Sequence, residues 1–143
     1  MVRPRFTAGH LILNKMTDIE RFSLGEEGED IAVEALNEQG YKIVERNHRN
    51  RFGEIDIIAE QDTVVCFIEV KTRSSDSKGS GLDAVSKAKQ HKLSQLAVLY
   101  LKDNKLMGRK ARFDVVSIRH RADGGHHIKI VQNAFELSSK YAY

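Results

Sequence analysis

The sequence is poor in the residues that mark several classes of protein. It has one cysteine, one proline and no tryptophan among 143 residues. The single cysteine, Cys66, cannot form a disulfide within the chain, which argues against a disulfide-stabilised secreted domain. No apolar run approaches the roughly 20 residues that a membrane-spanning helix needs. The short apolar patch at residues 11–13 does not resemble a secretory signal. These absences favour a cytoplasmic protein without a membrane partner.

Charge of one sign is not in large excess either. The net charge is +3, and the composition is that of a soluble domain with one core, 41% hydrophobic and 30% charged. A charge this small permits nucleic-acid binding without requiring it, because clustering matters more than the total. Basic residues do cluster in two places, at residues 46–51 and among Lys87, Lys89, His91 and Lys92. Either cluster is also compatible with a solvated face.

The hydrophobic pattern predicts a single α/β domain over residues 21–143, after a flexible tail or extension at 1–20. Helices are expected at 25–39 and 82–102. Strands are expected at 41–47, 54–60, 63–71, 111–118 and 127–131, with a flexible polar loop at 73–81. The order α-β-β-β-α-β-β predicts a mixed sheet of about five strands flanked by helices.

Acidic residues interrupt the two most apolar predicted strands. Side chains alternate along a strand, so Glu54 and Asp56 share one face, and Glu69 and Lys71 share a face of the next strand. A connecting loop of two or four residues would bring Asp56 and Glu69 to the same face, whereas a three-residue loop would separate them. We expect a four-residue loop, 61–64, to place them directly opposite, and a two-residue loop to place them diagonally.

Two carboxylates that meet in a partly apolar setting need a proton, a cation or water. Mg²⁺ is commonly held by one or two carboxylates together with water and phosphate oxygens. Lys71 would then face a phosphate or an attacking water. The pattern therefore indicates metal-assisted hydrolysis of a phosphodiester. The alternative is an exposed end of a sheet where the charges are simply solvated.

Motifs along most of the chain add a family resemblance. Residues 53–56 and 67–71 resemble the PD-(D/E)xK nuclease signature, with Ile55-Asp56 in place of Pro-Asp. A wider pattern spans residues 24–136 and includes Gly25, Gly28, Glu29, Ala32, Gly40, Tyr41, Asn47, Arg73, Ala84, Val85, Lys89, Arg112, Phe113, Asp114, Asn133, Ala134 and Phe135. This pattern resembles the YraN family of small bacterial proteins. That family is similar in fold to archaeal Holliday-junction resolvases and restriction endonucleases.

The resemblance implies roles for individual residues. Asp56 and Glu69 would be the metal-binding carboxylates, and the backbone carbonyl of Val70 would supply a further ligand. Lys71 would be the catalytic lysine. Glu29, on the first helix, matches the acidic residue that resolvase-like members bring to the metal. The implied cofactor is Mg²⁺ or Mn²⁺.

The resemblance also implies a partner and an activity. The protein would be a DNA endonuclease, acting on branched DNA of the Holliday-junction kind, and a two-fold homodimer is expected. Arg49, Arg51, Arg73 and Lys89 would contact phosphates; Lys89 would otherwise support the site. Two alternatives stay open: a nucleic-acid-binding module without catalysis, and a protein-interaction domain that keeps the nuclease fold.

Other polar residues have more ordinary interpretations. Asp114 is expected to form a structural ion pair with Arg73 or Arg112 rather than to contact a metal. Cys66 is expected to be a buried packing residue. Glu54 ranks below Asp56 and has no assigned role. The six histidines contain no pair at helical i, i+4 spacing, so a zinc site is not expected.

Overall fold

The computed structural model describes residues 18–74 and 85–137. Within these ranges the helices and strands follow the predicted order, which confirms the α/β class. They are α2 (Asp18–Glu38), β1 (Lys42–Asn50), β2 (Gly53–Gln61), β3 (Val64–Arg73), α3 (Lys87–Asp103), β4 (Ala111–His120) and β5 (His126–Phe135). No helix in these ranges is long and apolar enough to cross a membrane.

Several boundaries differ from the predicted ones. α2 begins at Asp18, so residues 18–20 belong to this helix and not to the expected extension. The sequence hides this start because Gly25 and Gly28 lie inside the helix, and glycine is a poor helix former. β5 has 10 residues, more than the predicted 127–131, because its mostly exposed side chains weaken the strand pattern. β1 extends to Asn50, so the first basic cluster lies mainly on a strand.

The second helix also begins later than predicted. Ser86 caps α3, and its hydroxyl accepts a hydrogen bond from the backbone N–H of Lys89. An N-cap of this kind satisfies one of the free N–H groups of the first turn. Residues 1–17 and 75–84 lie outside the described ranges, and with them most of the predicted tail and of the loop 73–81.

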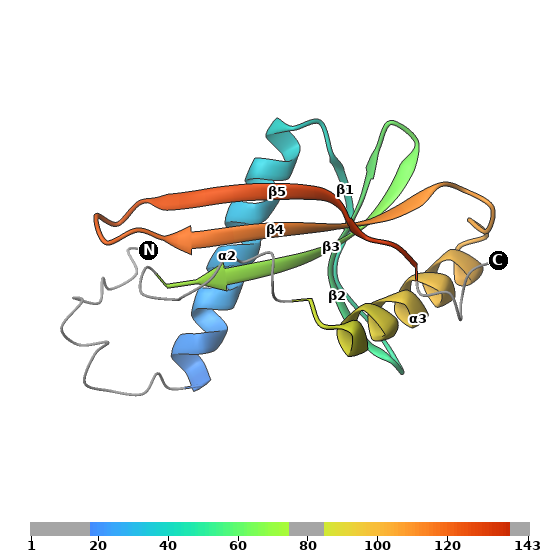
Figure 1. Ribbon diagram of the computed structural model, residues 1–143, viewed down its shortest axis with the longest axis horizontal. Helices are drawn as coiled ribbons and strands as arrows, with labels where there is room; N and C mark the ends of the chain where they lie inside the picture. Colours follow the sequence, from blue (N-terminus) through green and yellow to red (C-terminus); the bar gives the residue numbers. More distant parts are fainter. Residues whose placement is uncertain (1–17, 75–84, 138–143) are drawn as a thin grey trace.

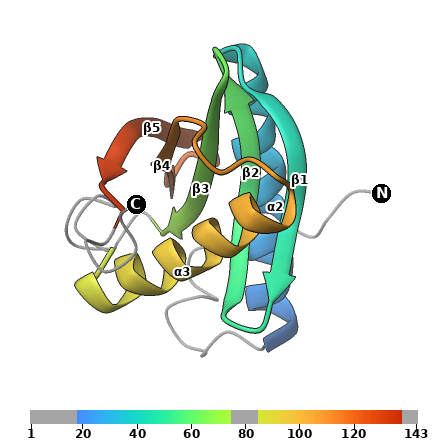
Figure 2. The ribbon, with the colours of Figure 1, turned by 90° about the vertical axis from the view of Figure 1, so that its right-hand side faces the viewer.

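The five strands form one sheet in the order β1-β2-β3-β4-β5. β3 and β4 are parallel and the other neighbours are antiparallel. α2 and α3 cover opposite faces of the sheet (Figure 1; Figure 2). Each helix buries its own core: α3 packs with Ile58 and Phe67, and α2 packs with Ile57 and Ile68. Cys66 is fully buried in the α2 side of the core, as predicted.

The β2–β3 turn brings the two acidic motifs into register. The pair Gln61↔Val64 closes a two-residue turn, in which Asp62 and Thr63 have positive φ, as in a type I′ hairpin. The observed pairs end at Ile57↔Ile68, and one further step would place Asp56 directly opposite Glu69. The expected diagonal arrangement for a two-residue turn is therefore wrong. The two turn residues, 62 and 63, are the middle residues of the predicted loop 61–64. The observed strand register is therefore the one that the four-residue loop predicts.

β2 changes its orientation at Asp56. Ile55 packs in the α3 side of the core and Ile57 in the α2 side, although residues two apart in a regular strand share a face. On β1 the pairs His48↔Ile55 and Arg46↔Ile57 leave Asn47 across from Asp56. Asn47 has a φ of 54°, a left-handed conformation that asparagine adopts more readily than most residues. This local irregularity sets the direction in which Asp56 leaves the strand.

A buried polar network surrounds Asp114 on β4. Asp114 is completely buried and accepts hydrogen bonds from Arg112, from the Tyr41 hydroxyl at 2.8 Å and from the Asn133 N–H at 2.9 Å. The predicted structural ion pair of Asp114 is thus confirmed, with Arg112 as its partner. The amide of Gln132 joins the network by donating to the Tyr41 hydroxyl.

The Arg112–Asp114 pair gives a test of this packing. Arg112→Met should leave a buried carboxylate without its cation and lower the free energy of unfolding by about 3–5 kcal/mol. Arg109→Met is the matched control, because its partner Glu60 is partly exposed, and it should cost about 1 kcal/mol or less. Denaturant unfolding measures both. Equal losses from the two variants would contradict the buried-pair account.

The conformation of Asn47 gives a second test. Asn47→Val should destabilise the protein by about 1–2 kcal/mol relative to Asn47→Gly, because only glycine and a few polar residues adopt the left-handed region without strain. Thermal unfolding of the two variants, compared with the wild type, measures the difference. A valine variant as stable as the glycine variant would show that β1 is regular at this position.

Candidate metal centre

Close packing of α2 on β3 brings Glu29 to the sheet. Gly28 is buried at this contact, and a Cβ added to it would lie 2.4 Å from the Oγ1 of Thr72. A larger residue would force the helix or the threonine to move. Glycine therefore lets the helix approach β3, and the next residue in the helix, Glu29, reaches toward β2.

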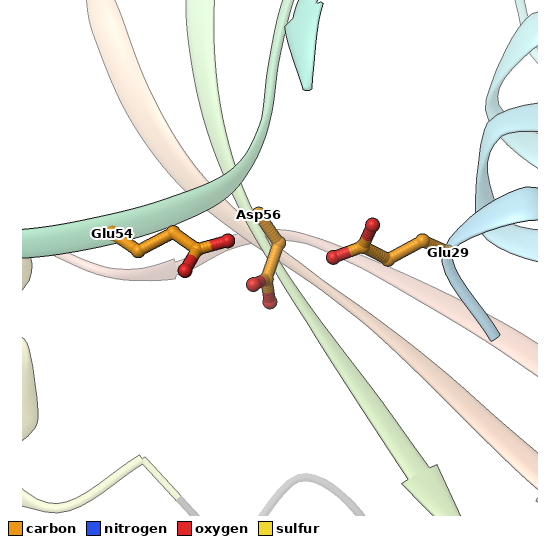
Figure 3. A group of neighbouring side chains, drawn as sticks. All are labelled: Glu29, Glu54 and Asp56. Carbon is orange, nitrogen blue, oxygen red and sulfur yellow. The ribbon is translucent and has the colours of Figure 1, made fainter. Parts of the chain in front are cut away.

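Three carboxylates converge in front of β2. One oxygen each from Glu29, Glu54 and Asp56 lies within 4.8 Å of the other two. Figure 3 shows the Glu29 side chain extending from α2 toward Glu54 and Asp56. The sequence pattern alone assigns no role to Glu54. The i, i+2 spacing of Glu54 and Asp56 on one strand is the signal that indicates their proximity.

Asp56 has a strongly shifted pKa. Its Oδ2 accepts a hydrogen bond of 2.8 Å from the backbone N–H of Val70, just beyond the last β2–β3 pair. Burial, and then repulsion from Glu69, raise the pKa of Asp56 to about 7. Near neutral pH the carboxyl group therefore holds a proton or needs a cation. The proposed carbonyl ligand role of Val70 stays a prediction; its N–H orients Asp56.

Glu69 lies beside this group and has a basic partner. Its side chain is buried, and the Lys89 ammonium of α3 contacts its Oε1. Glu69 is not a member of the 4.8 Å group, although it is close enough to raise the pKa of Asp56. The structure thus brings Asp56 and Glu69 together, as predicted from the turn, but joins Glu69 to Lys89.

Lys71 lies two residues after Glu69 on β3, close enough to Glu69 and Asp56 for their charges to affect it. Burial and the nearby Lys89 ammonium lower the pKa of Lys71, while Glu69 and Asp56 oppose the shift. A lysine of this kind gives up its proton more readily than one in water. Lys71 therefore lies close to Asp56 and Glu69.

Basic side chains of β1 surround the same carboxylates. Arg49 Nε lies 3.2 Å from Glu54 Oε2, and Arg46 Nη2 lies 3.7 Å from Glu29 Oε2. The structure therefore brings Arg49 and Lys89 to the acidic group. It directs Arg51 elsewhere, with its guanidinium 4.9 Å from the centre of the Phe52 ring.

Arg73, the last residue of β3, lies close enough to Lys71 to help lower its pKa.

The donor set fits a hard divalent cation. Carboxylates from α2 and β2 meet at one place, with Glu69 of β3 nearby, and oxygen ligands of this kind suit Mg²⁺ or Mn²⁺. The pKa of Asp56 is raised first by burial and then by the charge of Glu69, and a bound cation would favour the charged carboxylate against both effects. Asp56 and Glu69, with Glu29 and Glu54 beside them, are the residues that would hold the ion.

Comparison with known proteins assigns the family. The model of "Uncharacterised protein family UPF0102" matches residues 28–118. A UPF0102 protein of Desulfosudis oleivorans is 42% identical over 119 residues, which cover 83% of this chain and 94% of the relative. One from Symbiobacterium thermophilum is 45% identical over 112 residues, 78% of this chain and 95% of the relative. The chain belongs to the UPF0102 family.

This assignment confirms the YraN resemblance found in the sequence. A further UPF0102 protein, from Myxococcus xanthus, is 40% identical over 111 residues, 78% of this chain and 88% of the relative. The segment matched by the UPF0102 model begins one residue before Glu29 and includes Asp56, Glu69 and Lys89. The candidate metal centre therefore lies entirely within the part of the chain that defines the family.

The pKa of Asp56 predicts how the stability of this UPF0102 protein depends on pH. Because that pKa rises from its ordinary value of 3.8 to about 7 on folding, the folded state binds the proton more tightly than the unfolded chain. The contribution of Asp56 to stability should therefore fall as pH rises from about 4 to 7. Thermal unfolding in EDTA measures this, and Asp56→Asn should remove the contribution. An identical pH profile for both proteins would contradict the assignment.

Proposed function

We propose that this protein is a metal-dependent DNA endonuclease of the PD-(D/E)xK type that acts on branched DNA. One observation carries the proposal: Asp56 and Glu29 converge from a strand and a helix, with Glu69 and Lys71 on the neighbouring strand beside them. These are the residues that the nuclease resemblance marks as functional. The preference for branched DNA rests on the resemblance to Holliday-junction resolvases.

The acidic residues would serve as the cation site. A bound Mg²⁺ or Mn²⁺ would stabilise charge on the phosphate and lower the pKa of a bound water. The Val70 N–H keeps the Asp56 carboxylate oriented, and α2 supplies Glu29 from the opposite side. Because these groups belong to packed elements, little reorganisation is needed when the ligand arrives.

Lys71 would place an ammonium group against a phosphate oxygen or the attacking water. Its partial burial and lowered pKa favour a direct role in proton transfer or charge stabilisation over a purely solvated charge. Arg46 and Arg49 on β1, and Lys89 on α3, would bind the phosphates on either side of the reacting one. This binding should weaken with salt.

A binding module without catalysis is the second candidate. It is favoured by the basic side chains beside the acidic group: Lys89 contacts Glu69, Arg49 pairs with Glu54, and Arg46 lies 3.7 Å from Glu29 while it pairs with Asp30. Such a module would bind DNA in a salt-dependent manner and would tolerate the loss of Asp56. A protein-interaction domain is the third, and it would bind no DNA.

Cleavage of defined DNA substrates separates these candidates. Wild type, Asp56→Asn, Lys71→Gln and the exposed control Asp103→Asn are incubated with labelled four-way, flapped, single-stranded and linear duplex DNA, in Mg²⁺, Mn²⁺ or EDTA. We expect wild type and Asp103→Asn to cut branched DNA only with a divalent ion. The Lys71→Gln variant should lose about 10²–10³-fold in rate, as expected when one electrostatic stabiliser is removed.

Three other outcomes of this experiment would contradict the proposal that the protein is a nuclease. Equal cleavage by wild type and Asp56→Asn would indicate a contaminating enzyme. No cleavage, with DNA still shifted in a gel by both proteins, would favour the binding module. Neither cleavage nor a shift would favour the protein-interaction domain.

A further inference from the structure

Lys89 contacts the most buried of the candidate metal ligands. The Glu69 side chain is 9% exposed, whereas the Lys89 side chain is 43% exposed. The partly exposed lysine therefore extends inward and neutralises a carboxylate that is buried away from solvent. α3 is fixed independently of this contact, by the Ser86 cap and by the burial of Leu93 and Leu96.

The two arginine pairs around the centre are weaker. Arg46 lies 3.7 Å from Glu29, and Arg49 is 76% exposed where it meets Glu54. Exposed pairs of this kind gain little energy, because water competes with them. Of these three ion pairs, that of Lys89 involves the most buried carboxylate.

A divalent cation and the Lys89 ammonium would compete for the same carboxylate. Both are attracted by Glu69, and two cations held at contact distance in a partly buried site repel each other strongly. The side chain of lysine is long and flexible, and that of Lys89 is 43% exposed, so its ammonium group can leave Glu69 without moving α3.

We propose that Lys89 is an internal counter-ion of Glu69 that leaves the carboxylate when a divalent cation binds and then binds a DNA phosphate. The inference rests on the proposed function and adds a regulatory step to it. In the metal-free protein the lysine is held by Glu69 and is not available to DNA. Metal binding frees it, so metal and DNA each increase the affinity for the other.

The variant Lys89→Gln tests the competition for Glu69. Removing the competitor should tighten Mg²⁺ binding, measured calorimetrically without DNA, by about tenfold, within the range usual for coupled sites. The matched control is Lys102→Gln, which removes the same charge from an exposed residue in the last turn of α3 and should leave Mg²⁺ affinity unchanged. Unchanged or weaker Mg²⁺ binding by Lys89→Gln would overturn the proposal.

DNA binding by the same variants tests the second half of the exchange. In EDTA, Lys89→Gln should bind four-way DNA as tightly as wild type, because Glu69 holds the lysine in that state. In Ca²⁺, used as a hard cation in place of Mg²⁺, it should bind about tenfold more weakly than wild type. An equal loss of affinity in EDTA and in Ca²⁺ would show that Lys89 is an ordinary phosphate contact and would contradict the exchange.

A measurement on the wild type removes any dependence on the folding of the variant. Lysine-reactive labelling followed by mass spectrometry should modify Lys89 faster in Mg²⁺ than in EDTA, with Lys102 modified at the same rate in both. Equal labelling of Lys89 in the two conditions, in a protein that binds Mg²⁺, would refute the exchange and leave the proposed function standing. A wild type that binds no Mg²⁺ would refute both.

Discussion

Mutual repulsion among carboxylates at the end of the β2–β3 ladder is the constraint around which this structure is arranged. Glu29, Glu54 and Asp56 meet within 4.8 Å, and Glu69 lies beside them. Such a group cannot remain fully charged in a partly buried place without compensation. The protein compensates it with a backbone N–H that donates to Asp56 and with basic side chains of β1 and α3, and the pKa of Asp56 is nevertheless raised.

The backbone uses one device twice, with different electrostatic consequences. Asn47 on β1 and Asn133 on β5 both have positive φ, and each lies close to a buried or half-buried aspartate of the neighbouring strand. At Asp114 the cation Arg112 and the Tyr41 hydroxyl complete the compensation, and the result is a structural network. At Asp56 the neighbours include further acids, and burial together with the charge of Glu69 raises the pKa of its carboxyl group to about 7. Asp114 and Asp56 therefore differ in the side chains around them and not in the backbone conformation of the neighbouring strand.

The sequence predicted most of the architecture because its strands follow the period-2 pattern and lie close together along the chain. It also predicted that Asp56 and Glu69 lie near each other, since the turn fixes the register of the two strands. It could not predict the irregularity at Asn47 and Asp56, which depends on how two strands twist together, nor the participation of Glu54. The Lys89–Glu69 pair joins residues 20 positions apart through the docking of α3, and no local pattern indicates it. The full length of β5 was missed because an edge strand with exposed side chains loses the apolar alternation.

The central claim is that these carboxylates form one cation site. Anomalous diffraction from crystals of the protein grown with Mn²⁺ tests it most directly, because the ion is located without reference to any activity. The account predicts a single strong anomalous peak bounded by Asp56, Glu29 and Glu69, with the Lys89 ammonium displaced from Glu69. A fully ordered site without an anomalous peak, or a peak only at another place on the protein, would contradict it.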